Sequence, residues 1–460
     1  MHTRNFAVAG SALLACLLLA ACGGGGDQKG AATQATASTD SACTAPASWF
    51  PTVQQPVNFQ VDNTNCNFHQ WAWQEFLWLM QSSGNGGQAN FLALANPNDL
   101  FVANPLPYPG RAANANAATA LDFMPRDVKD EDLQDPTSIH QAGDNGVLID
   151  QAGQPVFYSI VIDSVWYNFA RSNGFNTDSG FRAAPDTLNF PTSGIGALEV
   201  KTAWRVAVVG DSTHIANASS RFFTTQALIP TVTIVNDTFI TDTTKMRPAT
   251  LALVGMHVVG TVPGHPEFIW ATFEQVDNAP LCSATPQGAT NDSTGGAWSL
   301  YTPNLQCTTG TCNVKSAQTS FAPTPVCRVA AYGDTSTSSP NAQNIQSLNA
   351  SVQSQLASNS ILRNYRLIGG QWTFPGGLPV TFGDSTNIRG SSLLANLTME
   401  SFLQPSASGG GATCFNCHNG GNARNPKKIE VSHVWPLSFT QHSTGQTTAP
   451  AAGQTQGGRR

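Results

Sequence analysis

The sequence predicts a β-rich α+β fold, in which one large antiparallel-sheet domain carries a few helices and a distinct C-terminal segment. Residues 150–380 hold most of the predicted strands, because apolar and polar residues alternate there with the period of a strand. Residues 251–259 are apolar on both faces, which predicts a buried central strand. A Pro-Gly turn at residues 263–266 leads into a second strand over residues 268–276, so the two strands should form a hairpin.

The remaining elements follow from local patterns. Alternation in residues 198–208 predicts a half-buried strand with one solvent-exposed face. Further strands are expected over residues 156–162, 231–240, 327–332 and 361–374. Asn67, with Gln70 three residues later, is typical of a helix start. Helices are expected over residues 67–82, 341–358 and 391–403.

The composition is that of an exported, loop-rich globular protein. Only 11% of the residues are charged and the net charge is −6. Nucleic-acid binding needs a basic stripe, so the composition argues against a nucleic-acid partner. We expect residues 46–405 to form the globular domain, which is long enough to bury a large core.

The N-terminus predicts export. Arg4 precedes an apolar run over residues 6–21, which is too short for a membrane span and suits a signal peptide. The run ends in Leu-Ala-Ala-Cys22, which resembles the lipobox of bacterial lipoproteins, and an ordinary cleaved signal is the alternative. The resemblance implies a signal peptide over residues 1–21 and a lipid anchor on Cys22. Because Gly23 rather than Asp follows, the resemblance implies sorting to an outer membrane, facing the periplasm or the cell surface.

Residues 22–45 begin with a stretch that is rich in Gly, Ala, Thr and Ser, and they should form a flexible tether. The polar residues 443–460 should form a disordered tail. An acylated Cys22 on such a tether would hold the domain near a membrane surface.

The most informative motif is Cys-Phe-Asn-Cys-His at residues 414–418. The spacing C-x-x-C-H is typical of c-type haem attachment, in which two thiols add to the porphyrin vinyl groups. Cys414 and Cys417 would then form the thioethers, and His418 would be the proximal ligand of the haem iron. The alternative is a structural disulfide beside an unrelated histidine. Only 42 residues follow His418, so we expect residues 406–442 to be a haem-binding segment packed against the large domain.

The chain has ten cysteines, and this number supports an oxidising compartment. Cys16 lies in the leader, Cys22 in the lipobox and two more in the motif. The other six are an even number and predict three disulfides. We expect Cys43 to pair with Cys66, and the remaining four to pair among themselves: Cys282, Cys307, Cys312 and Cys327.

The second axial ligand of the iron decides the chemistry, and the sequence offers three candidates. Met399 lies on a predicted helix shortly before the motif, where core packing is the alternative interpretation. His433 follows the motif closely, so the chain between them closes at little entropic cost. His257 lies on the buried strand, where a hydrogen-bonded core histidine is the commoner role. An open iron position is the fourth alternative.

Several strings resemble, together with the motif, exported bacterial proteins of the cytochrome c family. The similarity extends over about residues 66–420 and rests on residues 71–76, 198–204, 255–259, 268–278, 365–372 and 396–402. The resemblance implies one covalent haem c on Cys414 and Cys417, with His418 on the iron. It implies no settled substrate or reaction.

Three functions are compatible with these observations. The first is electron transfer with a redox partner protein, in which no residue acts catalytically. The second is a haem-dependent peroxidase or oxygenase, which needs an open distal iron position and polar groups beside it. The third is a surface binding module with a structural or sensory haem.

Overall fold

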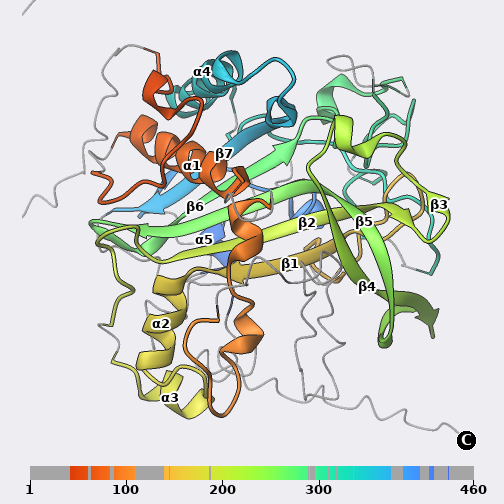
Figure 1. Ribbon diagram of the computed structural model, residues 1–460. Helices are drawn as coiled ribbons and strands as arrows, with labels where there is room; N and C mark the ends of the chain where they lie inside the picture. The colour runs from red at the N-terminus through yellow and green to blue at the C-terminus, as the bar shows by residue number, and fades with distance from the viewer. Residues whose placement is uncertain are drawn as a thin grey trace, which may run out of the picture. The chain divides into compact units, whose positions relative to one another are not determined.

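An eight-stranded antiparallel sheet forms the centre of the protein (Figure 1). The strand order is β1-β2-β5-β6-β7-β8, with β3 paired to β2 and β4 paired to β5. The strands are β1 (Phe157–Ile162), β2 (Leu198–Val209), β3 (Ser212–Thr213), β4 (Thr224–Val235), β5 (Thr238–Val262), β6 (His265–Gln275), β7 (Tyr365–Thr373) and β8 (Ile388–Gly390). This arrangement confirms the predicted β-rich α+β class with a large antiparallel sheet.

The computed structural model describes residues 42–60, 64–82, 88–109, 139–143, 146–185, 188–288, 290, 296–308, 310–315, 319–334, 336–374, 387–404, 414–418 and 434. The described α-helices are α1 (Asn65–Met80), α2 (Ser164–Ser172), α3 (Asp178–Ala183), α4 (Pro340–Gln355) and α5 (Cys414–Cys417). Single 3-10 turns occupy Ala47–Trp49, Asn90–Ala93, Pro97–Asp99, Ala218–Ser220, Cys282–Ala284, Ile361–Asn364 and Ser401–Leu403. Among these residues we find no helix with the length and hydropathy needed to cross a bilayer.

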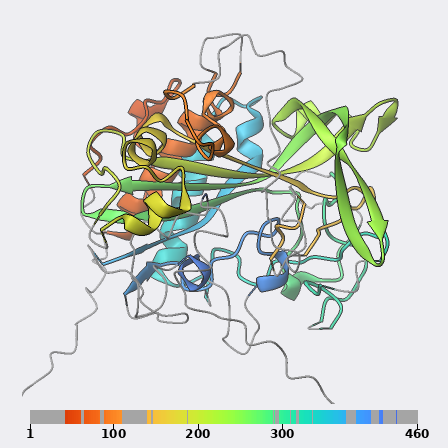
Figure 2. The same cartoon turned by 90° about the horizontal axis from the view of Figure 1, so that it is seen from below.

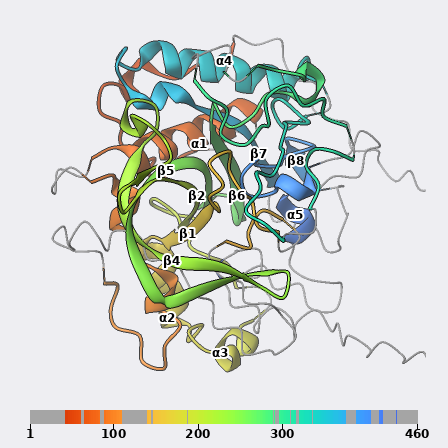
Figure 3. The same cartoon turned by 90° about the vertical axis from the view of Figure 1, so that its right-hand side faces the viewer.

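The helices divide between the two faces of the sheet. Helices α1 and α4 pack on one face, which we call the α1 face, while α2 and α3 lie on the opposite face (Figures 2 and 3). On the α1 face, Phe76 stacks on Phe273 with ring centroids 4.2 Å apart, and Trp73 meets the same ring edge-on at 5.0 Å. Burying aromatic side chains of this size contributes roughly 2–3 kcal/mol each, so this face supplies much of the core.

Helix α1 begins two residues before its predicted start. Thr64 is the N-cap, and its hydroxyl accepts a hydrogen bond from the Asn67 N–H at 3.4 Å. Asn67 is therefore inside the first turn, and its predicted capping role is wrong. Threonine and asparagine can both cap a helix, because the side-chain oxygen of either accepts a free N–H group of the first turn. The helix is present as predicted and is buried on two sides, because Trp71 and Trp73 are both fully buried.

Strand β2 has no wet face, contrary to the prediction. Glu199, Lys201 and Arg205 are all buried. The strand lies between β1 and β5, and further segments of the chain cover its second face. Polar partners offset the loss of water, as where the Arg205 guanidinium donates to the Asp150 carboxylate over 2.7 Å.

The predicted strand over residues 231–240 is instead a hairpin. Strand β4 ends at Val235 and β5 begins at Thr238, so a two-residue turn separates them. Asn236 and Asp237 have φ of 48° and 59°, the left-handed values that this tight turn requires. Asn and Asp tolerate this conformation, and the sequence analysis missed their turn chemistry.

Two other predicted elements are wrong and two are confirmed. Residues 391–403 form turns rather than a helix, because the Asn396 side chain accepts the Thr398 N–H at 2.8 Å and so competes with helical bonding. Residues 327–332 form one isolated bridge at Arg328. Helix α4 and the β5–β6 hairpin are present as predicted.

The disulfides agree with the sequence prediction. Cys43 and Cys66 are joined, with an S–S distance of 2.03 Å. The other four cysteines pair among themselves, as Cys282–Cys327 and Cys307–Cys312.

Candidate haem-attachment site

The motif adopts a helical backbone. Helix α5 covers Cys414–Cys417, and the His418 N–H donates to the Cys414 carbonyl at 2.9 Å, which is the bond of the next helical residue. Positions three and four residues apart lie on one side of a helix, so positions 414, 417 and 418 share one side. Only the backbone of Cys417 belongs to the described part of the chain.

Strands β6 and β7 fix the position of this helix. Trp270 and Gln371 are directly opposite in the β6–β7 register. The Cys414 N–H donates to the Gln371 side-chain oxygen at 2.8 Å, while the His418 ring stacks on Trp270 with centroids 4.4 Å apart and planes 27° apart. One cross-strand pair of the sheet therefore contacts both ends of the motif.

Phe415 anchors the motif in the core. Its side chain is 1% exposed and meets Trp270 edge-on at 6.4 Å. We call the cluster around it the motif cluster, and it also includes Val259, Phe268, Val434 and residues of α2. The anchor leaves Cys414 partly exposed, although its neighbour in the sequence is buried. The backbone of the motif is therefore fixed beside a partly exposed Cys414.

The residues present fit a c-type haem. A porphyrin attached in this way needs two thiols one helical turn apart and an imidazole on the same side, which is what the backbone of α5 provides. None of the three disulfides includes Cys414. The imidazole of His418 also has an orienting neighbour, because the Trp270 ring limits its rotation.

The three candidates for the second axial ligand lie in different parts of the chain's structure. Met399 is 1% exposed and packs with Tyr158 and Leu397, in a cluster separate from the motif cluster. His433 lies outside the described residues, but its neighbour Val434 is buried in the motif cluster. Cys22 also lies outside the described residues.

His257 shares a sheet face with Trp270. Val259 pairs with Trp270 and His257 pairs with Thr272, so His257 lies one pleat repeat away from Trp270. Its Nε2 atom is 3.0 Å from Oε1 of Glu400, and this hydrogen bond occupies the nitrogen that a distal ligand would use. Of the two candidates that the structure describes, His257 is the one on the same sheet face as Trp270, and it is bonded to a carboxylate.

His257 belongs to a polar group that the sequence analysis missed. Lys201 is directly opposite His257 in the β2–β5 register. Glu400, in the segment after β8, forms a hydrogen bond with His257 and interacts electrostatically with Lys201. Burial acts to raise the pKa of Glu400, but the charge and hydrogen bond of His257 and the charge of Lys201 outweigh it and lower the pKa to about 2. We call Lys201, His257 and Glu400 the polar triad.

A glycine allows the triad to form. A Cβ atom on Gly255 would lie 2.2 Å from the Thr398 hydroxyl and 2.9 Å from the Asn396 side-chain oxygen. Only glycine lets residues 396–400 approach the sheet this closely, so Gly255 determines where Glu400 lies. The triad could have been suspected from the sequence only through the two charged residues, Glu199 and Lys201, on a strand that proves to be central.

We compared the chain with known proteins after establishing this geometry. No family model, no curated protein and no solved structure matches it. The resemblance to the cytochrome c family therefore stays a prediction from the sequence.

Proposed function

We propose that this protein is a membrane-tethered c-type haem protein that transfers electrons in the periplasm or at the outer membrane. The observation that supports this proposal best is the helical C-x-x-C-H motif fixed by Trp270 and Gln371. When bound, the haem supplies a reversible one-electron couple, which a redox partner protein would fill and empty.

The residues of the chain hold and orient this group. Cys414 and Cys417 form the thioether links, and His418 binds the iron. Trp270 restricts the plane of the imidazole, and neighbours that orient a ligating histidine tune the metal it binds. Phe415 and Gln371 keep the helix attached to the sheet, so that little reorganisation accompanies a change of charge. A lipid on Cys22 would keep the domain at the membrane.

A haem-dependent peroxidase or oxygenase is the second candidate. The observation that favours it is the polar triad, which lies on the same sheet face as Trp270. Polar groups that hold and move protons are what O–O chemistry requires beside an open iron position. In the electron-transfer proposal, Lys201, His257 and Glu400 have no role beyond packing.

A matched pair of variants tests attachment. The protein would be produced in bacteria that attach haem c, and then run on a denaturing gel stained for haem. We expect Cys414→Ser/Cys417→Ser to abolish the haem stain, because both thioether links are lost. The control Cys307→Ser/Cys312→Ser removes two cysteines elsewhere and should keep the stain. Undiminished covalent haem in the first variant would refute the proposal.

The spectrum of the loaded protein separates the two candidates. We expect a low-spin ferric haem that is indifferent to added cyanide or carbon monoxide, as two axial protein ligands require. A high-spin haem that binds these ligands readily, and does so differently in Glu400→Gln, would favour the enzyme instead.

A further inference from the structure

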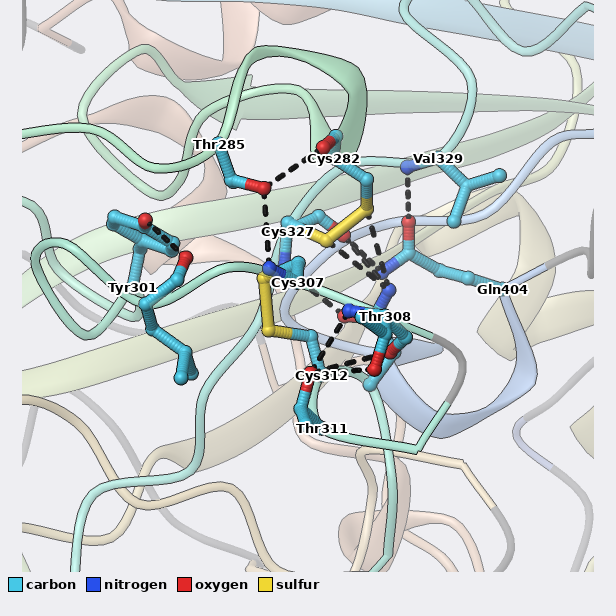
Figure 4. Close-up of a disulfide and its surroundings, with 12 residues drawn as sticks. Cys282, Thr285, Tyr301, Cys307, Thr308, Thr311, Cys312, Cys327, Val329 and Gln404 are labelled. Atoms are coloured by element: carbon cyan, nitrogen blue, oxygen red, sulfur yellow. Dashed lines mark hydrogen bonds between the residues drawn. A yellow bond between two sulfur atoms is a disulfide. The ribbon is translucent and has the colours of Figure 1, made fainter.

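Two disulfides lie side by side in the loops between β6 and α4 (Figure 4). We call them the four-cysteine cluster: Cys282, Cys307, Cys312 and Cys327. The sulfur atoms of Cys307, Cys312 and Cys327 all lie within 4.8 Å of one another, although the first two belong to one disulfide and the third to the other. Sulfurs at this separation suit a metal, but thiolates are the ligands and these sulfurs are oxidised.

Exposure differs within the cluster. Cys307 and Cys282 are partly exposed, whereas Cys312 and Cys327 are 5% and 1% exposed. Each disulfide therefore joins one partly exposed cysteine to one buried cysteine. The buried Cys312 and Cys327 belong to different disulfides, and their sulfurs lie within 4.8 Å of each other, as do those of Cys307 and Cys327.

The backbone of Cys327 is held by two amide side chains. The Asn313 side chain accepts the Cys327 N–H at 3.0 Å and donates to the Cys327 carbonyl at 2.9 Å. Gln404 donates to the same carbonyl at 3.0 Å. The Asn313 amide is also 3.8 Å from both sulfurs of the Cys282–Cys327 disulfide. A donor at that position stabilises a sulfur that leaves as thiolate.

We infer that the four-cysteine cluster is a thiol–disulfide exchange site that accepts two electrons from an external dithiol and moves them from Cys307–Cys312 to Cys282. This inference goes beyond electron transfer by a haem and does not depend on it.

The exchange conserves the number of disulfide bonds and of thiols across the protein and the dithiol. One thiolate of the dithiol attacks the sulfur of the partly exposed Cys307, and the bond to Cys312 breaks, so that Cys312 leaves as a thiolate. That thiolate attacks the Cys327 sulfur, a Cys312–Cys327 bond forms, and Cys282 leaves and takes a proton from water. The second thiol of the dithiol then releases Cys307 as a thiol. The dithiol is oxidised to a disulfide, and the protein gains two thiols, at Cys282 and Cys307.

Mapping after limited reduction tests the exchange. Purified full-length protein would be treated with dithiothreitol below the concentration that reduces Cys43–Cys66, quenched in acid, labelled with N-ethylmaleimide in denaturant and digested. We expect mass spectrometry to show loss of the Cys282–Cys327 peptide, gain of a Cys312–Cys327 peptide, and label on Cys282 and Cys307. Label on Cys307 and Cys312 alone, with Cys282–Cys327 intact, would overturn the inference.

A single variant tests the same contact without a reductant. In Cys282→Ser, Cys327 loses its partner, and we expect it to be recovered in a bond to Cys312 or Cys307. The matched control is Cys43→Ser, in which Cys66 should carry the label and form no new bond. Label on Cys327 alone, with Cys307–Cys312 intact, would contradict the inference. Should Cys282→Ser fail to fold, the reduction experiment on the native chain decides.

Discussion

His69 and Glu75 on one face of the sheet differ from Glu400 and Glu274 on the other face in the partners that surround them. On the α1 face, burial lowers the pKa of His69 to about 4, and burial together with the charge of Asp163 raises the pKa of Glu75 well above its usual range. Burial therefore favours the neutral form of each group. The opposite face, which carries Trp270 and the motif, is called the motif side. There, partner charges outweigh the effect of burial on the pKa of Glu400, which stays ionised, and Glu274 forms an ion pair with Arg328.

The difference follows from what lies within reach of each group. His69 has one hydrogen bond, from its Nε2 to the Asn341 side-chain oxygen at 2.8 Å, and Glu75 contacts an amide of Gln55 at 3.5 Å. Neither contact supplies a full opposite charge, and the charge of Asp334, which acts to raise the pKa of His69, is outweighed by desolvation. On the motif side, cationic residues lie across the sheet from the acids, and the charged state is the favoured one. The comparison therefore predicts which substitutions the protein tolerates.

Breaking the buried pair should have the largest effect. Arg328→Met leaves the Glu274 carboxylate, which is 0% exposed, without its ion-pair partner. We expect a loss of about 3–5 kcal/mol in the free energy of unfolding, measured with urea. The double variant Arg328→Met/Glu274→Gln should be less destabilised than the single one, because no unpaired charge is left behind.

The control for that prediction lies on the other face. Glu75→Gln replaces a carboxyl group whose neutral form is favoured by burial with a neutral amide of the same shape, and we expect a change of less than about 1 kcal/mol. A loss as large as that of Arg328→Met would show that Glu75 is ionised, and the contrast between the faces would be wrong.

Local signals were enough to predict much of this fold. Helix α4 starts with Ser339 as cap and proline at its first position, and the Pro-Gly pair at residues 263–264 marks the β5–β6 turn. The Cys43–Cys66 bond also followed from closeness in the sequence. Each of these features depends on a few adjacent residues, which is why a pattern could reveal it.

The errors have one physical cause in common: segments that are distant in the sequence bury residues that the local pattern places at the surface. Lys201 and Glu199 read as solvent-facing residues, because nothing local indicates that segments near Gln141 and Glu400 come to lie over that face. The motif itself was evident from its spacing. Its contact with Trp270 and Gln371 was not, because it depends on the register of β6 with β7 across a long connection.

The second prediction uses pH to separate two buried groups. Burial raises the pKa of Asp163, at the end of β1, to about 7 against hydrogen bonds from backbone N–H groups, whereas the pKa of His69 falls to about 4. Between about pH 4 and 6.5, folded Asp163 holds a proton that the unfolded chain releases, so its contribution to stability falls as pH rises. Folded His69 lacks a proton that the unfolded chain binds, so its contribution rises over the same window.

These opposing slopes should partly cancel in the native protein. Asp163→Asn keeps the cap of α2 and removes the first slope, so we expect stability to drop more steeply on acidification, by up to about 1.4 kcal/mol per pH unit. His69→Gln should do the reverse. Urea unfolding at pH 6.5, 5.5 and 4.5 measures both. Identical slopes in the two variants would mean that neither group changes its proton occupancy on folding.

The smallest effect should come from the polar triad, because Glu400 is one-quarter exposed and water screens its charge. A carboxyl whose pKa is lowered stabilises the fold above its unfolded pKa, and this contribution is lost as pH falls from about 4.5 toward 2. We expect Glu400→Gln to cost about 1 kcal/mol at pH 7 and almost nothing near pH 2. His257→Gln is the matched variant, and the double variant should cost less than the sum of the two single ones, because both remove the same hydrogen bond. Strictly additive losses at pH 7 would show that His257 and Glu400 do not stabilise each other, and the motif side would then resemble the α1 face.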